Sequence, residues 1–183
     1  MRSKLFVPLA AALSLSACGS SEDTREGPIS PEDAAEALSN AETPRAGQYR
    51  TNVEVLEFDI PGIPKAQQEQ MRAMMAGSIT AEQSYCLTEA EAENGGREMA
   101  KNLAAGDCSF NEFRASGNTL YADMVCKGAD GAQGNVILEG TTTRNSSDMT
   151  MTMNQRLPGM PGEGSMNMKM HMVSERVGDC TSG

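Results

Sequence analysis

Methionine occupies every second position in two stretches near the C-terminal end of this chain. The first stretch contains Met149, Met151 and Met153, and the second runs from Met166 to Met172. A period of two residues is the period of a β-strand, because successive side chains point to opposite faces of a sheet. Each stretch therefore predicts a strand that presents one continuous methionine face.

The alternation also predicts how these strands pair. Residues 144–147 form a polar turn before the first methionine stretch, and residues 157–162 form a Pro- and Gly-rich loop before the second. Antiparallel pairing across both segments brings the two stretches side by side with all the methionines on one face. The pairs predicted across the first turn are Thr142 with Met149, Gly140 with Met151 and Leu138 with Met153.

The N-terminal residues have the layout of a secretory signal peptide, with a basic start, a short apolar run and small residues at the end. The apolar run is too short to span a membrane. Residues 15–18 resemble the bacterial lipobox, in which the cysteine is acylated and becomes the first residue of the mature chain. We therefore expect residues 1–17 to be a lipoprotein signal peptide and Cys18 to carry palmitate and other acyl chains. Gly19 favours anchoring to the outer membrane, with the protein facing the periplasm.

Charge and composition divide the remaining chain into two parts. The net charge of −10 repels nucleic acid, so we exclude nucleic acid as a partner. Residues 18–45 are rich in Ser, Glu, Asp, Pro and Ala and predict an acidic flexible tether, with one short helix over residues 31–40. Residues 46–183 predict one disulfide-stapled, β-rich domain. With no Trp and 4% aromatic residues, its core has to be filled by Met, Leu, Val and Ile.

Four cysteines lie in the domain, and an even number in an exported chain predicts two disulfides with three possible connectivities. Residues 115–118 form a hairpin turn that contains Gly and Asn. The register that follows from this turn pairs Cys108 with Cys126 and Phe110 with Met124. If that register holds, Cys108–Cys126 is a cross-strand disulfide and Cys86–Cys180 is the second.

The first half of the domain predicts one long strand and two helices. Apolar residues alternate over residues 49–60, with a change of phase at Val55 and Leu56 that predicts a bulge. Residues 64–77 have a helical pattern, and a Thr-x-x-Glu capping box starts a second helix at Glu89. The predicted fold class is α+β. It consists mainly of an antiparallel meander of about six strands, as a curled sheet or half-barrel, with two helices inserted after the first strand.

Several short motifs occur in a characteristic order. They are Pro61-Gly62-Ile63-Pro64 before the Met-rich helix, Cys86-Leu87-Thr88 before the acidic helix, Cys108 and Cys126 around a hairpin, a Thr-Met-Thr-Met strand, a Pro-Gly-Met-Pro loop and the closing Arg176-Val177-Gly178-Asp179-Cys180. This order resembles an uncharacterised family of exported Gram-negative proteins, a domain of unknown function (DUF 3617), over about residues 45–181. The family opens with Pro-Gly-x-Trp, where this chain has Ala46-Gly47-Gln48-Tyr49. The resemblance implies the same domain boundaries and disulfides in a lipoprotein member, and it implies no activity.

Catalytic groups are sparse. His171 is the only histidine. Alternation along the strand places it on the face opposite to that of Met170 and Met172, the same face as Lys169 and Val173. One histidine cannot assemble a metal-hydrolase triad, and the carboxylates gather on helices that we expect to be exposed. We therefore expect a protein that is not an enzyme, with no catalytic residue and no cofactor.

Three binding hypotheses follow. The favoured one is a non-catalytic binding or envelope-associated domain with an unidentified protein partner or apolar ligand, in which the methionines form the core and no metal is bound. Because thioether sulfur selects Cu(I), the second is a periplasmic copper-binding protein that uses Met-x-Met strands, with Met160, Met166 and His171 as ligands. The third is a carrier that holds a lipid or another apolar ligand on a concave, methionine-lined face.

Overall fold

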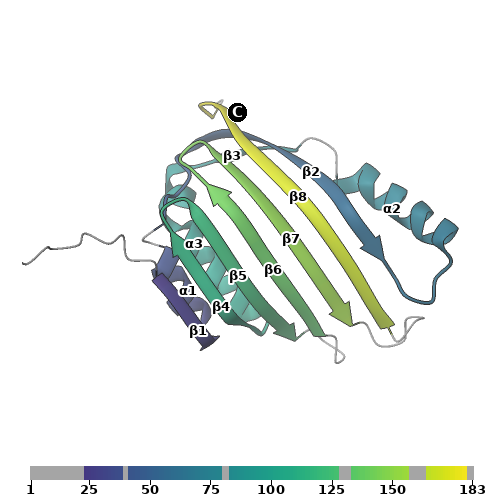
Figure 1. Cartoon of the computed structure of the whole chain (residues 1–183). Coiled ribbons are helices and arrows are strands. Elements are labelled where there is room, and N and C mark those ends of the chain that lie inside the picture. Colours follow the sequence, from purple (N-terminus) through teal and green to yellow (C-terminus); the bar gives the residue numbers. More distant parts are fainter. Residues whose placement is uncertain (1–22, 39–40, 80–82, 128–132, 157–163, 181–183) are drawn as a thin grey trace, which may run out of the picture.

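The computed structural model describes residues 23–38, 41–79, 83–127, 133–156 and 164–180. The elements in this part of the chain are β1 (Asp23–Ile29), α1 (Pro31–Leu38), β2 (Gly47–Asp59), α2 (Lys65–Ile79), β3 (Gln83–Leu87), α3 (Glu89–Ala105), β4 (Cys108–Ser116), β5 (Thr119–Lys127), β6 (Gln133–Thr142), β7 (Ser146–Arg156) and β8 (Ser165–Gly178). The eight strands form one antiparallel sheet in the order β1-β4-β5-β6-β7-β8-β2-β3 (Figure 1). The sheet is curved and open, with β1 at one edge and β3 at the other.

The predicted meander is confirmed from β4 to β8, where each strand lies beside the next. In the β4–β5 hairpin, Cys108 lies opposite Cys126 and Phe110 opposite Met124, as predicted. Gly117 supplies the positive φ of 56° in the turn. This register could be predicted locally because a short hairpin loop sets the pairing of the strands that it joins.

The β6–β7 pair differs from its predicted register by two residues. Gly140 lies opposite Met149 instead of opposite Met151. The turn is tighter than predicted, because the backbone N–H of Thr143 donates a hydrogen bond of 2.7 Å to the carbonyl oxygen of Ser146. A shift of two residues keeps every side chain on its original face. The predicted methionine face is therefore confirmed although the pairs that form it are different.

The predicted bulge lies in β2. The pairing of β2 with β8 changes register between Val55 and Glu57, and Val53 and Phe58 consequently pack against the same apolar cluster. Strand β3 was not predicted, and it pairs only with the first residues of β2. The sheet therefore has two more strands than the predicted six, β3 at one edge and β1 at the other.

Residues 23–38 lie inside the predicted flexible tether, but they form β1 and α1. Strand β1 pairs with β4, and α1 places Ala34 and Ala37 in the core with no exposed surface. The helix starts with the predicted cap, since the backbone N–H of Asp33 donates to Ser30 Oγ at 3.1 Å. Small side chains let α1 lie close to the sheet, so a helix with little apolar surface is still packed. The folded region thus begins before the predicted boundary, and the tether prediction does not hold for these residues.

The two predicted helices correspond to α2 and α3. The capping box of α3 is present, because the backbone N–H of Glu91 donates to Thr88 Oγ1 at 3.2 Å and the Glu91 carboxylate accepts from the backbone N–H of Thr88 at 2.8 Å. Helices α1 and α3 pack together near β4, and α2 lies at the opposite side, beside β2 (Figure 1). Within the described ranges, no helix is long and apolar enough to cross a bilayer.

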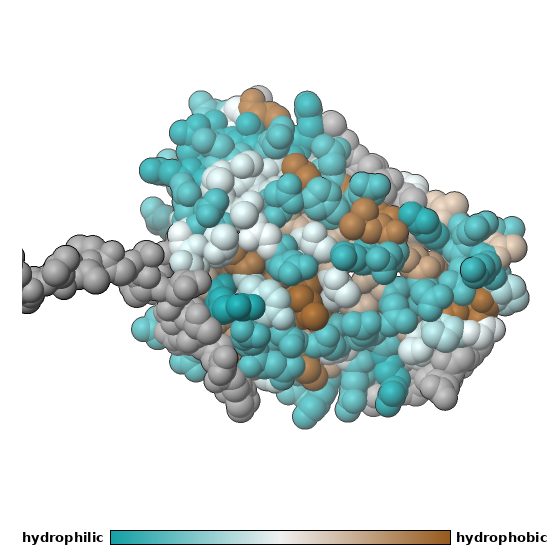
Figure 2. Space-filling model, in the orientation of Figure 1, coloured by the Kyte–Doolittle hydropathy of each residue, from teal (hydrophilic) through white to brown (hydrophobic). Residues whose placement is uncertain are grey.

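The core consists of two clusters along one face of the sheet. The α1 cluster contains Ile29, Ala34, Ala37, Phe110, Phe113, Ala115, Ala122 and Met124. The methionine cluster contains Val55, Met168 and Met170, with Val53, Phe58, Met75, Met151 and Met153 packed against them. The surface visible in Figure 2 is mainly hydrophilic, with small separate hydrophobic areas.

Candidate functional site

Six methionines of β7 and β8 form cross-strand pairs on the apolar face, and we call them the methionine block. The pairs are Met149 with Met172, Met151 with Met170 and Met153 with Met168. Met149, Met168 and Met170 are each only 8% exposed. A fully buried methionine stabilises a fold by roughly 1.5 to 3 kcal/mol, and the block provides much of the apolar material on its side of the sheet. The structure therefore buries Met149, Met168 and Met170 and leaves Met151, Met153 and Met172 partly buried on the same face.

The predicted copper ligands do not come together. Met166 lies opposite Gln155 and His171 lies opposite Thr150. The two residues are five positions apart along β8, and an odd separation puts them on opposite faces of the sheet. They cannot share one metal ion in this fold. Met160 lies outside the described residues. Across the described ranges, no group of three or more His, Cys, Asp and Glu side chains is placed to hold a metal ion.

His171 has a structural partner on the polar face. Its Nε2 atom lies 2.7 Å from Asp148 Oδ1, and Glu54 of β2 lies opposite it in the sheet. The His171 side chain is 34% exposed and that of Asp148 is 63% exposed. An exposed ion pair of this kind contributes about 0 to 1 kcal/mol. The contact gives the imidazole a partner on the polar face of the sheet.

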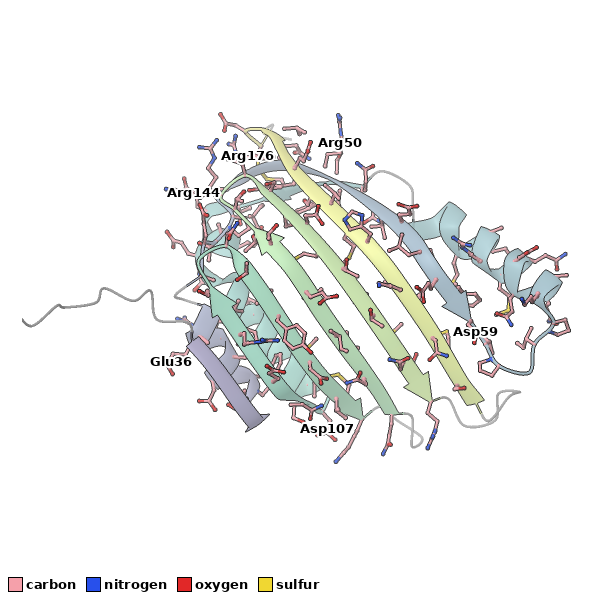
Figure 3. All side chains as sticks on the ribbon, viewed as in Figure 1. Glu36, Arg50, Asp59, Asp107, Arg144 and Arg176 are labelled. Atoms are coloured by element: carbon pink, nitrogen blue, oxygen red, sulfur yellow. A yellow bond between two sulfur atoms is a disulfide. The ribbon has the colours of Figure 1, made fainter. Side chains whose placement is uncertain are left out.

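A cleft of about 1080 Å³ lies at the end of the sheet where β2 begins and β8 ends. Three arginines from distant segments line it: Arg45 before β2, Arg144 in the β6–β7 turn and Arg176 on β8. Arg144 and Arg176 are labelled at this end of the molecule in Figure 3. We call this site the arginine cleft. It is also lined by Glu42, Glu89, Glu93, Asp179, Cys86 and Cys180.

The buried side chain of Tyr49 joins the backbone segments that carry Arg45 and Arg144. Its ring is 2% exposed and stacks on Tyr85, with 5.5 Å between the ring centroids. The hydroxyl donates to the carbonyl oxygen of Arg45 at 2.8 Å and lies 3.2 Å from that of Arg144. Burial raises the pKa of the Tyr49 hydroxyl above its usual value, and Arg176 and Arg45 partly oppose this rise. The hydroxyl therefore stays protonated and can act as the donor at neutral pH.

Arg176 is the most enclosed of the three arginines, with a side chain that is 15% exposed. Its Nε donates to the carbonyl oxygen of Ala46 at 2.9 Å, and its Nη2 is paired with Asp179. The neighbouring Gly47 leaves room for the guanidinium, because a Cβ at this position would overlap Arg176 Nε. Every one of these contacts fixes the guanidinium at the base of the cleft.

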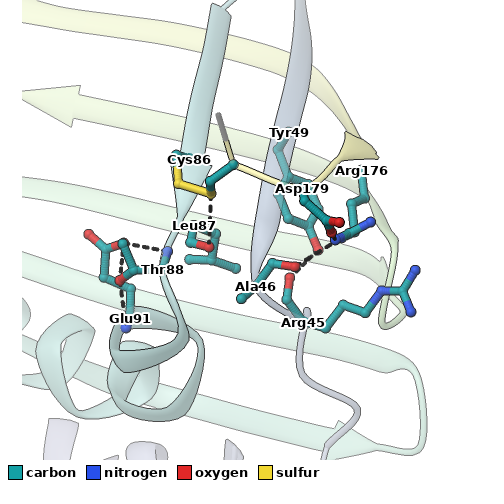
Figure 4. Close-up of a disulfide and its surroundings, with 10 residues drawn as sticks. Arg45, Ala46, Tyr49, Cys86, Leu87, Thr88, Glu91, Arg176 and Asp179 are labelled. Atoms are coloured by element: carbon teal, nitrogen blue, oxygen red, sulfur yellow. Dashed lines mark hydrogen bonds and ion pairs between the residues drawn. A yellow bond between two sulfur atoms is a disulfide. The ribbon is translucent and has the colours of Figure 1, made fainter. Parts of the chain in front are cut away.

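The opposite wall of the cleft is formed by the end of β3 and the start of α3. The Cys86–Cys180 disulfide joins this wall to the end of β8, and Cys180 Sγ lies 3.8 Å from the carbonyl oxygen of Leu87. Figure 4 shows the disulfide between the start of α3 on one side and Arg45 and Arg176 on the other. The cleft is therefore bounded by segments that a covalent bond holds together.

Besides Glu42 and the Arg176–Asp179 pair, the charged residues of the cleft are two arginines and two glutamates. The backbones of Arg45 and Arg144 are adjacent, since the backbone N–H of Arg45 donates to the carbonyl oxygen of Arg144 at 3.0 Å. Glu89 and Glu93 lie one turn apart on α3. All four side chains are exposed. Within the described part of the chain, no ion pair joins the arginine pair to the glutamate pair.

A second and smaller cleft, of about 310 Å³, lies at the other end of the strands. Amide side chains dominate it, and Asn135, Asn154 and Asn167 lie next to one another across β6, β7 and β8. The amide nitrogen of Asn135 already donates to Asp123 Oδ1 at 2.6 Å.

The model of one protein family, described as a protein of unknown function (DUF3617), matches residues 44–180. The chain belongs to this family. Comparison with curated proteins found no match, and comparison with solved structures found none. The DUF3617 match ends at Cys180 and contains all three arginines of the cleft, whereas β1 and α1 precede it. The family resemblance expected from the motifs is thus confirmed, and it assigns no molecular function.

Both predicted disulfides are present, as Cys86–Cys180 and Cys108–Cys126. The signal peptide and the predicted acylation site Cys18 lie outside the described residues. The arginine cleft was not predicted, because its arginines are far apart in the sequence. The only local signal was Arg176 in the closing motif.

Proposed function

We propose that this DUF3617 member is a lipoprotein, anchored to the outer membrane through Cys18, that faces the periplasm and acts as a non-catalytic binding domain in the cell envelope. The signal-peptide pattern of residues 1–17 supports export. The Cys86–Cys180 and Cys108–Cys126 disulfides support an oxidising compartment, because the cytosol keeps thiols reduced.

The arginine cleft is the observation that carries the binding function. Its frame is set by Tyr49, by the Arg176 contacts and by the Cys86–Cys180 disulfide. Ligand sites are usually preformed concave surfaces on which a few polar groups converge. Here the frame presents the exposed guanidinium groups of Arg45 and Arg144. A small polar ligand is the occupant that this arrangement favours.

Anchoring through Cys18 has a geometric consequence. Cys18 is five positions before Asp23, where β1 begins. A fully extended chain advances at most about 3.6 Å per residue, so the β1 edge lies within roughly 18 Å of the acylated residue. The domain is then held close to the membrane surface instead of far out in the periplasm.

The anchor is tested by Cys18→Ser in the full chain, followed by fractionation of cell envelopes. The wild-type chain is expected in the outer-membrane fraction and the variant in the soluble periplasmic fraction. A Ser20→Ala variant controls for changes near the cleavage point. If the Cys18→Ser chain still fractionates with the outer membrane, the lipoprotein proposal is wrong.

The binding function is tested by native mass spectrometry of the full chain, extracted from envelopes in a mild detergent. A co-purifying mass is expected that is lost in the Arg45→Gln/Arg144→Gln variant and kept in Arg156→Gln, which changes an exposed arginine at the far end of β7. A bare wild-type mass, or a bound mass that the double variant retains, contradicts the cleft as the site.

A second candidate function is the apolar carrier, and one observation favours it. Met151, Met153 and Met172 are only partly buried, and among the described side chains of α2 it is Met75 that packs against the cluster beside them. The same measurement separates the two candidates. A fatty-acid or phospholipid mass that is lost in Met151→Glu but kept in the double arginine variant would favour the carrier.

A further inference from the structure

We propose that the arginine cleft binds a small zwitterion, a molecule with an ammonium group and a carboxylate group, such as a short peptide with free ends. This inference rests on the proposed binding function and adds the chemical class of the ligand. It follows from the way in which the charges are distributed over the two walls.

Two arginines line one side of the cleft and two glutamates line the other. Backbone hydrogen bonding places Arg45 beside Arg144, and the helical repeat places Glu89 beside Glu93. Like charges one helical turn apart repel one another, so an ammonium group that binds Glu89 and Glu93 relieves a repulsion. A carboxylate can bind the two arginines.

The two pairs are carried by different segments of the chain. The Tyr49 hydroxyl donates to the backbone carbonyl oxygen of Arg45, and the glutamates lie at the start of α3, which the Cys86–Cys180 disulfide ties to the end of β8. In the described residues the two pairs make no ion pair although both line one cleft. A ligand that reaches from one wall to the other can contact both pairs at once.

A ligand with a single charge fits less well. An anion that binds Arg45 and Arg144 is repelled by Glu42 and by the glutamates of α3. A cation that binds the glutamates is repelled by the arginines. A zwitterion gains attraction from both walls. The cleft of about 1080 Å³ accommodates a tripeptide, which is about 10 Å long when extended.

The experiment is a calorimetric titration of the full chain, in mild detergent at neutral pH and low ionic strength, with three matched probes. Triglycine carries both charges, N-acetyl-triglycine only the carboxylate and triglycine amide only the ammonium. Triglycine is expected to bind at least about tenfold more tightly than either blocked form, because each blocked form loses one charge-assisted contact.

Two double variants assign each charge to its wall. Arg45→Gln/Arg144→Gln is expected to remove the preference for triglycine over triglycine amide, and Glu89→Gln/Glu93→Gln the preference over N-acetyl-triglycine. Arg156→Gln and Glu139→Gln, exposed residues outside the cleft, are the matched controls and are expected to keep both preferences. Because the readout is a preference between probes, a general loss of affinity does not imitate it.

Two outcomes overturn the inference. If N-acetyl-triglycine binds as tightly as triglycine, the cleft is an anion site, and the proposed binding function stands without the zwitterion. If none of the probes binds, the zwitterion class is wrong. The binding function is judged separately, by whether a co-purifying mass depends on Arg45 and Arg144.

Discussion

The two clusters on the apolar face share one sheet but are packed in different ways. In the α1 cluster, Phe110 and Phe113 meet edge to face with 5.4 Å between ring centroids, and Ala34 and Ala37 of α1 lie in the core with no exposed surface. In the methionine cluster, α2 contributes Met75 and most of the remaining contacts are methionines of the strands. Rigid rings need a closely fitted cover, whereas flexible thioethers fill irregular space with little help.

Each region also has its own disulfide. Cys108–Cys126 joins β4 and β5 beneath the α1 cluster, and Cys86–Cys180 joins β3 to the end of β8 on the methionine side. The disulfide beside the α1 cluster thus links two strands of one hairpin, whereas the disulfide on the methionine side links two segments that are far apart in the chain. This difference makes the comparison between the two regions measurable.

The largest expected effects come from the two disulfides. The cysteines are separated by 94 residues in Cys86–Cys180 and by 18 in Cys108–Cys126. Replacing Cys86 and Cys180 by serine is expected to lower the free energy of unfolding by about 4.7 kcal/mol, and replacing Cys108 and Cys126 by about 3.2 kcal/mol. The first loss is larger because the unfolded chain gains more entropy when the longer loop is opened. Guanidinium unfolding without reductant checks this. A larger loss at the short loop contradicts it.

The next effect compares one core residue from each cluster. Phe113→Ala is expected to cost about 4 kcal/mol, because rigid neighbours leave a cavity open. Met170→Ala is expected to cost about 2 kcal/mol, because neighbouring methionines can move into the space. Urea unfolding of both variants gives the two values. Equal losses would show that the methionine side is as rigid as the aromatic one.

A third comparison concerns the helices that cover the clusters. Ala34→Leu is expected to destabilise the fold by about 1 to 3 kcal/mol, because α1 has no space for a larger side chain. Met75→Ala on α2 is expected to cost about 1 kcal/mol or less, because this side chain is only partly buried. Thermal unfolding ranks them. A greater loss for Met75→Ala would mean that α2 is the more important cover.

The smallest effect is a pH dependence at the start of α3. Hydrogen bonds from the backbone and side chain of Thr88 lower the pKa of Glu91 below the ordinary value of a glutamate carboxyl group, 4.5. A lowered pKa means that the folded state favours the carboxylate, so the contribution is present above about pH 4.5 and is lost as pH falls through the folded-state pKa. Unfolding of Glu91→Gln, followed across this range, is expected to show a shallower fall than wild type. If the free energy of unfolding falls equally steeply with pH in both chains, Glu91 does not contribute to the pH dependence.

The local features of the fold could be predicted from the residues alone. Alternating methionines predicted the strands and their common face, the change of phase at Val55 predicted the bulge, and Thr88 with Glu91 predicted the start of a helix. The hairpin turn predicted Cys108–Cys126, and with it Cys86–Cys180. These predictions succeeded because each depends on residues that are close in the chain or on the strict period of a strand.

What the sequence by itself determined about this protein is its family, its two disulfides and a mainly antiparallel sheet with an apolar methionine face. Only the tertiary structure decided that residues 23–38 pack on the sheet, that the β6–β7 turn is tight, and that Met166 and His171 face opposite ways. It also assembled the arginine cleft from Arg45, Arg144 and Arg176. The physical reason is that no local pattern marks residues that the strand order brings together. Segments distant in sequence become neighbours only when the whole sheet has formed and packed on its core.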